Sequence, residues 1–312
     1  MKVLLTGASG FLGSHIAKAL ASKPDIAVVA SLRGAVSVPN VQIVRVADVS
    51  AMTDWSDALY GTHLVIHTAA RAHVIKDNGV DPLAEYRRVN VDGTLNLARQ
   101  AAEAGVSRFL FVSSIGVNGN INSTPFTEDD EPNPCGLYAQ SKWEAEQGLW
   151  EVQRQTGIEV VIIRPPLVYG PNAPGNFGSL VKRVAQGVPL PLGAIYNSRS
   201  LVAVDNLVDL IINCIDHPAA ANQVFLAGDG QDLSTTELLQ GVAKAMDKPS
   251  RLFRVPSSWL IFGATFFGKR IVAQKLLGSL QVDISKARNL LGWKPPISVE
   301  EGLRRCFESR ER

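Results

Sequence analysis

Short apolar runs alternate with longer, helix-like stretches through the first half of the chain. Six runs are apolar at nearly every position, as strands are when both faces of a parallel sheet are covered. They span residues 2–7, 26–32, 41–48, 63–70, 108–114 and 158–165, and the helix-like stretches span 11–22, 53–60, 83–104 and 137–156. This alternation predicts an α/β fold with a Rossmann-type, doubly wound parallel sheet.

The pattern loosens after residue 165. Pro and Gly gather in residues 164–178 and again in 187–193, which predicts loops around short helices. Residues 224–228 have the composition of one more strand, and a helical pattern follows from about residue 234.

The chain of 312 residues is long enough for two domains. We expect a dinucleotide-binding Rossmann domain at 1–168, to which 199–228 returns. We expect a smaller, mainly helical substrate domain at 169–312.

Composition and charge are those of an ordinary globular enzyme, with 46% apolar residues, 19% charged residues and a net charge of +2. No basic block indicates a nucleic-acid partner. The three cysteines are far apart and have neither metal-binding nor disulfide spacing, which is typical of a reducing cytoplasm. We therefore expect a cytoplasmic protein without a metal site.

Nothing in the sequence predicts a membrane-spanning segment or a signal peptide. The N-terminus begins directly with a strand pattern. The longest apolar run, residues 259–268, is about half of the ~20 residues that a spanning helix needs. Its length favours a lid or core helix over contact with a membrane surface.

A glycine-rich turn follows the first strand and opens the first helix, in the sequence TGASGFLGSH. Gly7, Gly10 and Gly13 permit a tight turn and let backbone N–H groups approach a pyrophosphate at a helix N-terminus. This strand–turn–helix context predicts a dinucleotide site.

The end of the second strand indicates which dinucleotide is bound. NAD-binding chains carry an acidic residue about 20 positions after the glycines, which holds the ribose 2′-OH. That window, VVASLRGAV, has no acid and offers Ser31 and Arg33. A hydroxyl and a cation suit a 2′-phosphate, so NADP is favoured and NAD is the alternative; Arg33 as a solvated loop residue is the other interpretation.

The ends of the third and fourth strands also face the predicted cofactor. Asp48 has two equal interpretations, as an acceptor from the adenine amine or as part of a strand-end turn. The small residues at 68–70 let the cofactor approach the backbone, and His67 is interpreted as a core residue.

Tyr138 and Lys142 are four residues apart in a helix-like stretch and therefore share one side of the helix. An ammonium beside a phenol favours the phenolate and lowers the pKa of the phenol from about 10. The pair is either a proton-transfer device or a surface contact.

Together the motifs TGASGFLG, HTAA, VNVDGT, VSS, YAQSK, RPPLVYGP and LGW-x-P resemble the extended short-chain dehydrogenase/reductase family. The resemblance is to its NAD(P)-dependent nucleotide-sugar epimerase, dehydratase and reductase branch. It implies a catalytic set of Ser114, Tyr138 and Lys142, with Asn90 holding the neighbouring strand ends. Ser114 would hydrogen-bond the sugar oxygen, Tyr138 would exchange its proton, and Lys142 would lower the pKa of the phenol and bond the nicotinamide ribose.

The resemblance also implies the binding residues. Arg199 would contact the sugar nucleotide's diphosphate through charged hydrogen bonds, with a surface arginine as the alternative, and Asn176 and Lys275 are further candidates. The substrate-binding set is Ser114, Asn176, Arg199 and Lys275. The cofactor-binding set is Gly7, Gly10, Phe11, Leu12, Gly13, Ser31, Arg33, Asp48, Val49, Thr68, Ala69, Ala70, Asn90, Tyr138, Lys142 and Pro165.

Departures from the family pattern narrow the activity. Ile115 and Gly116 stand where sugar 4,6-dehydratases place an Asp–Glu pair, and neither carries a proton, so dehydration is disfavoured. We expect a reductase acting at C4 of a UDP-4-keto-6-deoxy-N-acetylhexosamine in surface-polysaccharide synthesis. The alternative is a 4-epimerase of UDP-glucose or UDP-N-acetylglucosamine. A non-catalytic NAD(P) sensor is disfavoured by the intact catalytic set, and the resemblance implies a homodimer.

Overall fold

The computed structural model describes residues 1–32, 41–72, 81–266 and 276–308, and the statements below concern these parts. Two predicted site residues, Arg33 and Lys275, lie outside them. None of the helices in the described parts is long and apolar enough to cross a membrane.

A seven-stranded sheet forms the larger lobe, and its order β3-β2-β1-β4-β5-β6-β9 confirms the predicted doubly wound fold. All neighbouring strands are parallel. The winding reverses between β1 and β4, and ligands bind at such a switch point, beyond the carboxyl ends of the strands. The strands are β1 (Lys2–Thr6), β2 (Ala27–Leu32), β3 (Val41–Arg45), β4 (Leu64–His67), β5 (Arg108–Val112), β6 (Glu159–Arg164) and β9 (Gln223–Leu226).

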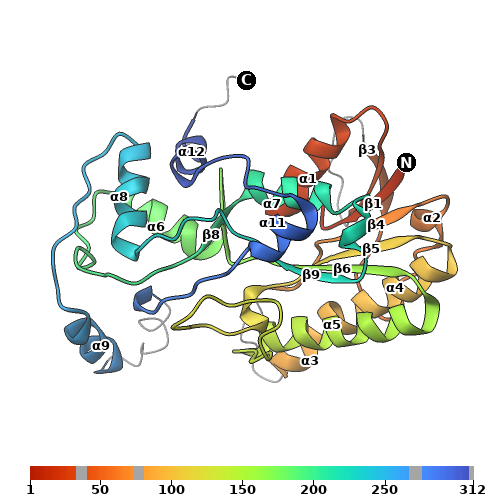
Figure 1. Cartoon of the computed structure of the whole chain (residues 1–312), viewed down its shortest axis with the longest axis horizontal. Coiled ribbons are helices and arrows are strands. Elements are labelled where there is room, and N and C mark those ends of the chain that lie inside the picture. Colours follow the sequence, from red (N-terminus) through yellow and green to blue (C-terminus); the bar gives the residue numbers. More distant parts are fainter. Residues whose placement is uncertain (33–40, 73–80, 267–275, 309–312) are drawn as a thin grey trace.

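Helices cover both faces of this sheet, as strands that are apolar on both sides require (Figure 1). One face carries α1 (Phe11–Ala21), α7 (Val204–Asn213) and α11 (Ser285–Leu291), whose apolar residues share a core with β1, β2 and β4. The other face carries α2 (Ser56–Leu59), α4 (Thr94–Glu103) and α5 (Leu137–Thr156). Thus α7, β9 and α11 return to the larger lobe from late in the sequence.

The predicted helix over 83–104 is divided into three segments. These are α3 (Pro82–Arg87), a π-helical turn (Arg88–Gly93) and α4. A Cβ built on Gly93 would lie 2.8 Å from the backbone carbon of Val49, so this turn packs directly against the loop after β3. Wide turns of this kind occur frequently at functional sites.

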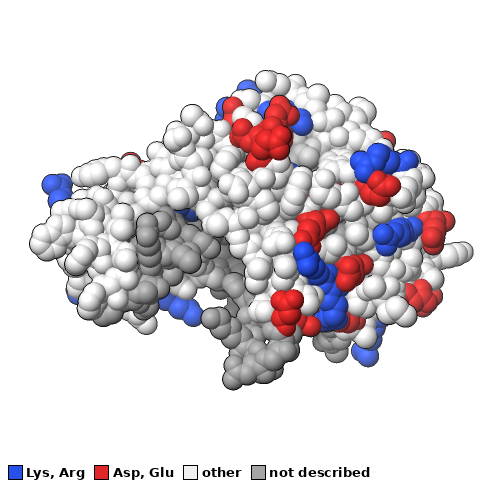
Figure 2. Space-filling view, turned by 90° about the horizontal axis from the view of Figure 1, so that it is seen from below, with Lys and Arg blue, Asp and Glu red and all other residues white. Residues whose placement is uncertain are grey.

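The smaller lobe has a two-stranded parallel sheet and a core of its own. Its elements are β7 (Leu167–Tyr169), α6 (Gly175–Ala185), β8 (Leu201–Ala203), α8 (Thr235–Ala245), α9 (Ser257–Phe266) and α12 (Val299–Arg305). Short 3₁₀ turns lie at Ile115–Val117 and Pro218–Ala220. Seen from below, a hollow separates the two lobes (Figure 2).

Candidate active site

The glycine turn between β1 and α1 has a conformation that other residues would not fit. Gly7 has φ +73°, and a Cβ on it would lie 2.6 Å from Thr68 Oγ1. A Cβ on Gly13 would lie 2.1 Å from the carbonyl oxygen of Gly7. No side chain caps the N-terminus of α1, so its first N–H groups are oriented toward the cleft in front of β1 and β4.

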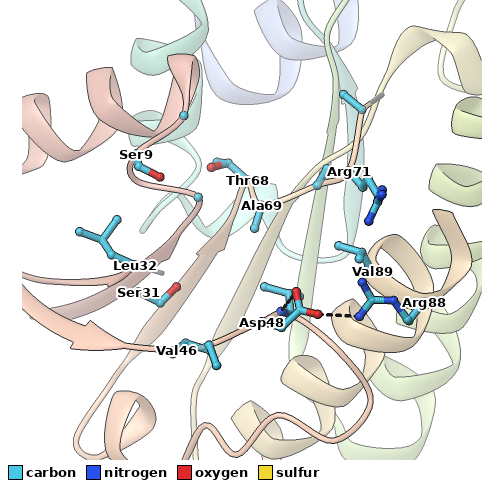
Figure 3. A pocket seen from close by; sticks show the side chains of 16 residues that line it. Ser9, Ser31, Leu32, Val46, Asp48, Thr68, Ala69, Arg71, Arg88 and Val89 are labelled. Atoms are coloured by element: carbon cyan, nitrogen blue, oxygen red, sulfur yellow. Dashed lines mark hydrogen bonds and ion pairs between the residues drawn. The ribbon is translucent and has the colours of Figure 1, made fainter. Parts of the chain in front are cut away.

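A cleft of about 810 Å³ opens at this switch point (Figure 3). Eight of the predicted cofactor-binding residues line it: Gly7, Gly10, Ser31, Asp48, Val49, Thr68, Ala69 and Ala70. Sequence reasoning missed Ser9, Leu32, Arg71 and Arg88, which also line it. No sequence motif marks these residues, because only the folded chain brings them beside the glycine turn.

Asp48 makes a strand-end turn and an ion pair at the floor of the cleft. It accepts a hydrogen bond from the Val49 N–H at 2.8 Å, and its Oδ2 lies 2.5 Å from Arg88 Nη1. The Arg88 side chain comes from the π-helical turn and points toward Asp48 in Figure 3. Asp48 also raises the pKa of Arg88. The predicted contact of Asp48 with adenine stays a prediction.

Seven of the described residues that we predicted to bind the cofactor do not line the cleft. Tyr138 and Pro165 line a second pocket, described below, and the other five lie elsewhere. Leu12 packs into the core beside the sheet, Phe11 contacts the cores of both lobes, and Gly13 closes the glycine turn. Asn90 is buried on the π-helical turn, where its side chain bonds Arg71 N at 2.8 Å and Ser141 Oγ at 2.9 Å. Asn90 thereby ties the segment after β4 to α5; the fifth residue, Lys142, is buried within α5.

His67 is a satisfied core residue in the structure. Its ring nitrogens lie 2.6 Å from Thr6 Oγ1 and 3.0 Å from Thr94 Oγ1. Burial, together with the nearby Lys142 ammonium, lowers the pKa of His67 to about 3. It is therefore neutral at ordinary pH.

A second pocket, of about 670 Å³, lies between the lobes. The larger lobe contributes the two predicted catalytic hydroxyls, Ser114 and Tyr138, and the smaller lobe contributes Asn176 and Arg199. Pro165 lines this pocket rather than the cleft. Tyr86, Gly119, Asn120 and Leu280 are further lining residues that sequence reasoning missed.

A short 3₁₀ turn positions Ser114, and the start of the long helix α5 positions Tyr138. Ser114 caps the 3₁₀ turn after β5 and accepts the Gly116 N–H at 3.1 Å. Tyr138 lies in the first turn of α5, edge-on to Tyr86 with ring centroids 6.1 Å apart. Burial, with Tyr86 as the smaller cause, raises the pKa of Tyr138 to about 12.

Lys142 differs from its expected state as a fixed ammonium beside the phenol. It is buried on α5, with Nζ 3.8 Å from the centre of the Phe111 ring. Burial lowers the pKa of Lys142 to about 7, and the Glu146 carboxylate one turn on opposes that shift. The raised pKa of Tyr138 and the lowered pKa of Lys142 share one physical cause, which is exclusion of water from charged groups.

A buried ion pair behind the catalytic residues was not predicted from the sequence. Glu146 on α5 pairs with Arg164 at the end of β6, with Nη2 to Oε2 at 2.6 Å. Glu146 also accepts a short hydrogen bond from Ser113. Arg164 Nη1 donates to Asn118 Oδ1 at 3.0 Å. The network thus joins the helix of Tyr138 to the turn of Ser114.

Arg199 is anchored at the wall of the second pocket. Its backbone exchanges hydrogen bonds with Leu233, and its Nη1 donates to the Gly278 carbonyl at 2.9 Å. Burial lowers the pKa of Arg199, although a guanidinium remains charged. Asn176 is exposed in the first turn of α6.

Comparison of the sequence with known proteins identifies a family and its relatives. The model of the NAD dependent epimerase/dehydratase family matches residues 3–228. A UDP-glucose 4-epimerase of Vibrio cholerae is 47% identical over 98% of this chain and 94% of its own length. An N-acetyl-α-D-glucosaminyl-diphospho-ditrans,octacis-undecaprenol 4-epimerase of Escherichia coli O157:H7 is 29% identical over 98% of this chain and 94% of its own.

One solved structure has the same fold and a comparable sequence. It is DesIV, a dTDP-glucose 4,6-dehydratase of Streptomyces venezuelae with NAD and TYD bound. It is 26% identical, has a TM-score of 0.76, and the alignment covers 98% of this chain and 95% of that one. The matched family spans both the glycine turn and the Ser114–Tyr138–Lys142 set, and the resemblance seen in the sequence is confirmed. The chain belongs to the NAD dependent epimerase/dehydratase family.

Proposed function

We propose that this protein is a UDP-hexose 4-epimerase that keeps NAD bound through its catalytic cycle. The observation that carries the proposal is the second pocket, where Ser114 and Tyr138 of the larger lobe meet Arg199 of the smaller lobe. The 47% identical UDP-glucose 4-epimerase supports epimerisation over the reduction that we expected from the sequence.

The cleft fits NAD in its backbone geometry. Gly7 and Gly13 leave no room for a side chain at the turn, and the N-terminus of α1 offers uncapped N–H groups for a pyrophosphate. Among the described residues that line the cleft, Asp48 is the one acid, and Arg88 pairs with it. When bound, NAD would supply the acceptor, and then the donor, of the hydride at C4.

The chain's own groups would handle the proton and the orientation of the sugar. Tyr138 would take the proton from the C4 hydroxyl as a phenolate, a state that the positive charge of bound NAD and of Lys142 favours, and would return it as the phenol in the reverse half-reaction. Ser114 hydrogen-bonds the same oxygen in both states. Arg199 holds the diphosphate as a guanidinium while the hexose turns between the two half-reactions. These roles rest on the family resemblance and on the arrangement of the pocket.

A second candidate is reduction at C4 with NADPH. It is favoured by Ser31 and Leu32, which end β2 beside the cleft where NAD-binding chains often have an acid. Arg33, the predicted partner of a 2′-phosphate, lies outside the described residues. The homodimer and the cytoplasmic location stay predictions.

The proposal is tested by incubating the protein with UDP-glucose and with UDP-N-acetylglucosamine without added nicotinamide, and following the products by NMR. We expect conversion to the C4 epimer. No conversion, together with stoichiometric NADPH oxidation when a UDP-4-keto-6-deoxy-N-acetylhexosamine is supplied, would replace epimerase with reductase.

A further inference from the structure

The helix α9 lies at the far end of the smaller lobe (Figure 1). It exposes large apolar side chains. Trp259 is 75% exposed and Phe262 is 77% exposed, and Ile261 between them is also exposed. The helix is anchored by Leu260, which packs against the core of the smaller lobe. We expected a lid or core helix over 259–268; the exposure of the described part disagrees with a core helix, and the lid helix stays a prediction.

Two of the exposed side chains are neighbours by helical geometry. Trp259 and Phe262 are three residues apart, so they are neighbours on the surface of α9. The segment that enters α9 adds Phe253, 49% exposed, and the exposed cations Arg251 and Arg254. We name this set the α9 patch; it consists of Arg251, Phe253, Arg254, Trp259, Ile261 and Phe262.

The sequence around α9 carries charge of one sign. Residues 248–282 hold six of the chain's 31 basic residues and none of its 29 acidic residues, and Lys248, Arg251 and Arg254 are the three of these that the structure describes. Seen from below, the smaller lobe shows Lys and Arg at its margins and hardly any acid, whereas the larger lobe carries both signs (Figure 2). A partner surface that complements this region is negatively charged and takes up aromatic side chains.

We propose that the α9 patch docks the protein on the surface of an anionic lipid bilayer. A helix with Trp and Phe exposed, flanked by Arg and Lys, inserts its apolar side chains at the boundary between headgroups and acyl chains. Nearby cations add attraction to anionic headgroups. The ten residues of α9 are too few to span the bilayer, so the contact is peripheral.

The chain that follows α9 in the sequence also contributes to the second pocket. The chain that follows α9 returns as residues 276–280, where the Gly278 carbonyl accepts Arg199 Nη1 and Leu280 lines the pocket. One wall of the pocket and the α9 patch are thus parts of the same stretch of chain. The inference is independent of the reaction catalysed, because binding to vesicles is measured without substrate.

The test is flotation of the full chain with vesicles of phosphatidylcholine alone, or of phosphatidylcholine with about a quarter phosphatidylglycerol. We expect flotation with the anionic vesicles only, weakened by raising the salt well above about 0.1 M. Trp259 is the most exposed of the tryptophans, so a blue shift of tryptophan fluorescence should accompany binding. No flotation at low salt, or equal flotation with both vesicles, overturns the proposal.

Variants locate the contact. The pair Trp259→Ser and Phe262→Ser should weaken partition by about ten-fold or more, since insertion depends on apolar area. The matched control is Met52→Ser with Tyr60→Ser, because these side chains of the larger lobe are 91% and 82% exposed. The control should float like the unmodified protein. Equal flotation of the α9 variant and the control would contradict the proposal.

A second variant keeps the test decisive if the apolar pair misfolds, which circular dichroism would reveal. Arg251→Gln with Arg254→Gln leaves the apolar side chains in place and should reduce both flotation and its salt dependence. Unchanged flotation of this variant would overturn the proposal. A dimer, detected by light scattering, that is lost in the α9 variant without any vesicle binding would assign the patch to a second copy of the chain instead.

Discussion

The two pockets of this protein are built in different ways. The cofactor cleft lies at the ends of successive strands, and its described lining residues all fall between Gly7 and Val89. The second pocket collects its lining from Pro82 to Leu280 and from both lobes. The first depends mainly on backbone geometry at one switch point, whereas the second depends on side chains that long-range packing brings together.

This difference separates the expected effects of substitutions. Substitutions in the second pocket should weaken sugar binding or slow proton transfer, and they should leave the affinity for the cofactor nearly unchanged. Changes in the buried network behind it should affect the fold itself. If one of the following predictions failed, the effects on catalysis, cofactor binding and stability would not be separable in this way.

Tyr138→Phe should have the largest effect on activity. The ring remains, but the proton donor is lost, so we expect kcat to fall by about a hundred- to ten-thousand-fold. The affinity for NAD should stay within a few-fold, measured by calorimetry. Tyr60→Phe, on the exposed surface of the larger lobe, is the matched control. Retention of more than a few per cent of kcat would remove Tyr138 from the proton-transfer role.

The buried Glu146–Arg164 pair should have the largest effect on stability. Arg164→Met leaves the Glu146 carboxylate buried beside Ser113, so the free energy of unfolding should fall by about 3–5 kcal/mol. Glu146→Leu combined with Arg164→Met removes both charges and should cost less than Arg164→Met alone. Urea unfolding provides the comparison.

An exposed pair is the control for this stability measurement. Lys244→Met breaks the surface ion pair with Glu300 and should leave the unfolding midpoint nearly unchanged. If Arg164→Met were as mild as Lys244→Met, the network would not hold the turn of Ser114 against α5.

Arg199→Ala should weaken binding of the substrate more than it slows the chemical step. A charged hydrogen bond to a diphosphate contributes roughly 1.5–3 kcal/mol, so KM should rise about ten- to hundred-fold with a smaller change in kcat. UDP should inhibit the variant correspondingly less. The same inhibition constant for UDP in both proteins would show that Arg199 does not bind the diphosphate.

Lys142→Met should impair activity and yet stabilise the fold, by roughly 1–2 kcal/mol near pH 7. Burial lowers the pKa of Lys142 from 10.5 to about 7, so between these values the unfolded chain binds a proton that the folded chain releases. Stability should therefore rise with pH across this window. The variant should lose that rise, which thermal melts from pH 7 to 10 would detect. Parallel pH profiles would show that Lys142 is not desolvated.

The fold and the cofactor cleft could be predicted from the sequence more completely than the second pocket. The glycine turn and α5 (Leu137–Thr156) were predictable because local spacing and turn chemistry determine them. The Arg88–Asp48 pair and the Glu146–Arg164–Asn118 network were not, because they join residues that are 18 to 46 positions apart. The lowered pKa of Lys142 could not be predicted from the sequence either, since it depends on burial rather than on the spacing from Tyr138.

The exposure of α9 could not be predicted from the sequence either. An apolar run of ten residues has the same pattern whether it is buried or exposed, and periodicity alone does not distinguish the two. Only packing decides that Leu260 points inward while Trp259 and Phe262 point outward.

The fate of the hydride tests the proposed epimerase most directly. UDP-glucose carrying deuterium at C4 is incubated with the full chain in the absence of added nicotinamide, and the UDP-galactose formed is analysed by mass spectrometry and NMR. If the hydride is taken up and returned within one pocket, the product keeps its deuterium at C4 and the bound cofactor is unchanged at the end. UDP-galactose that lacks deuterium at C4, or no galactose product at all, would contradict epimerisation by a resident cofactor.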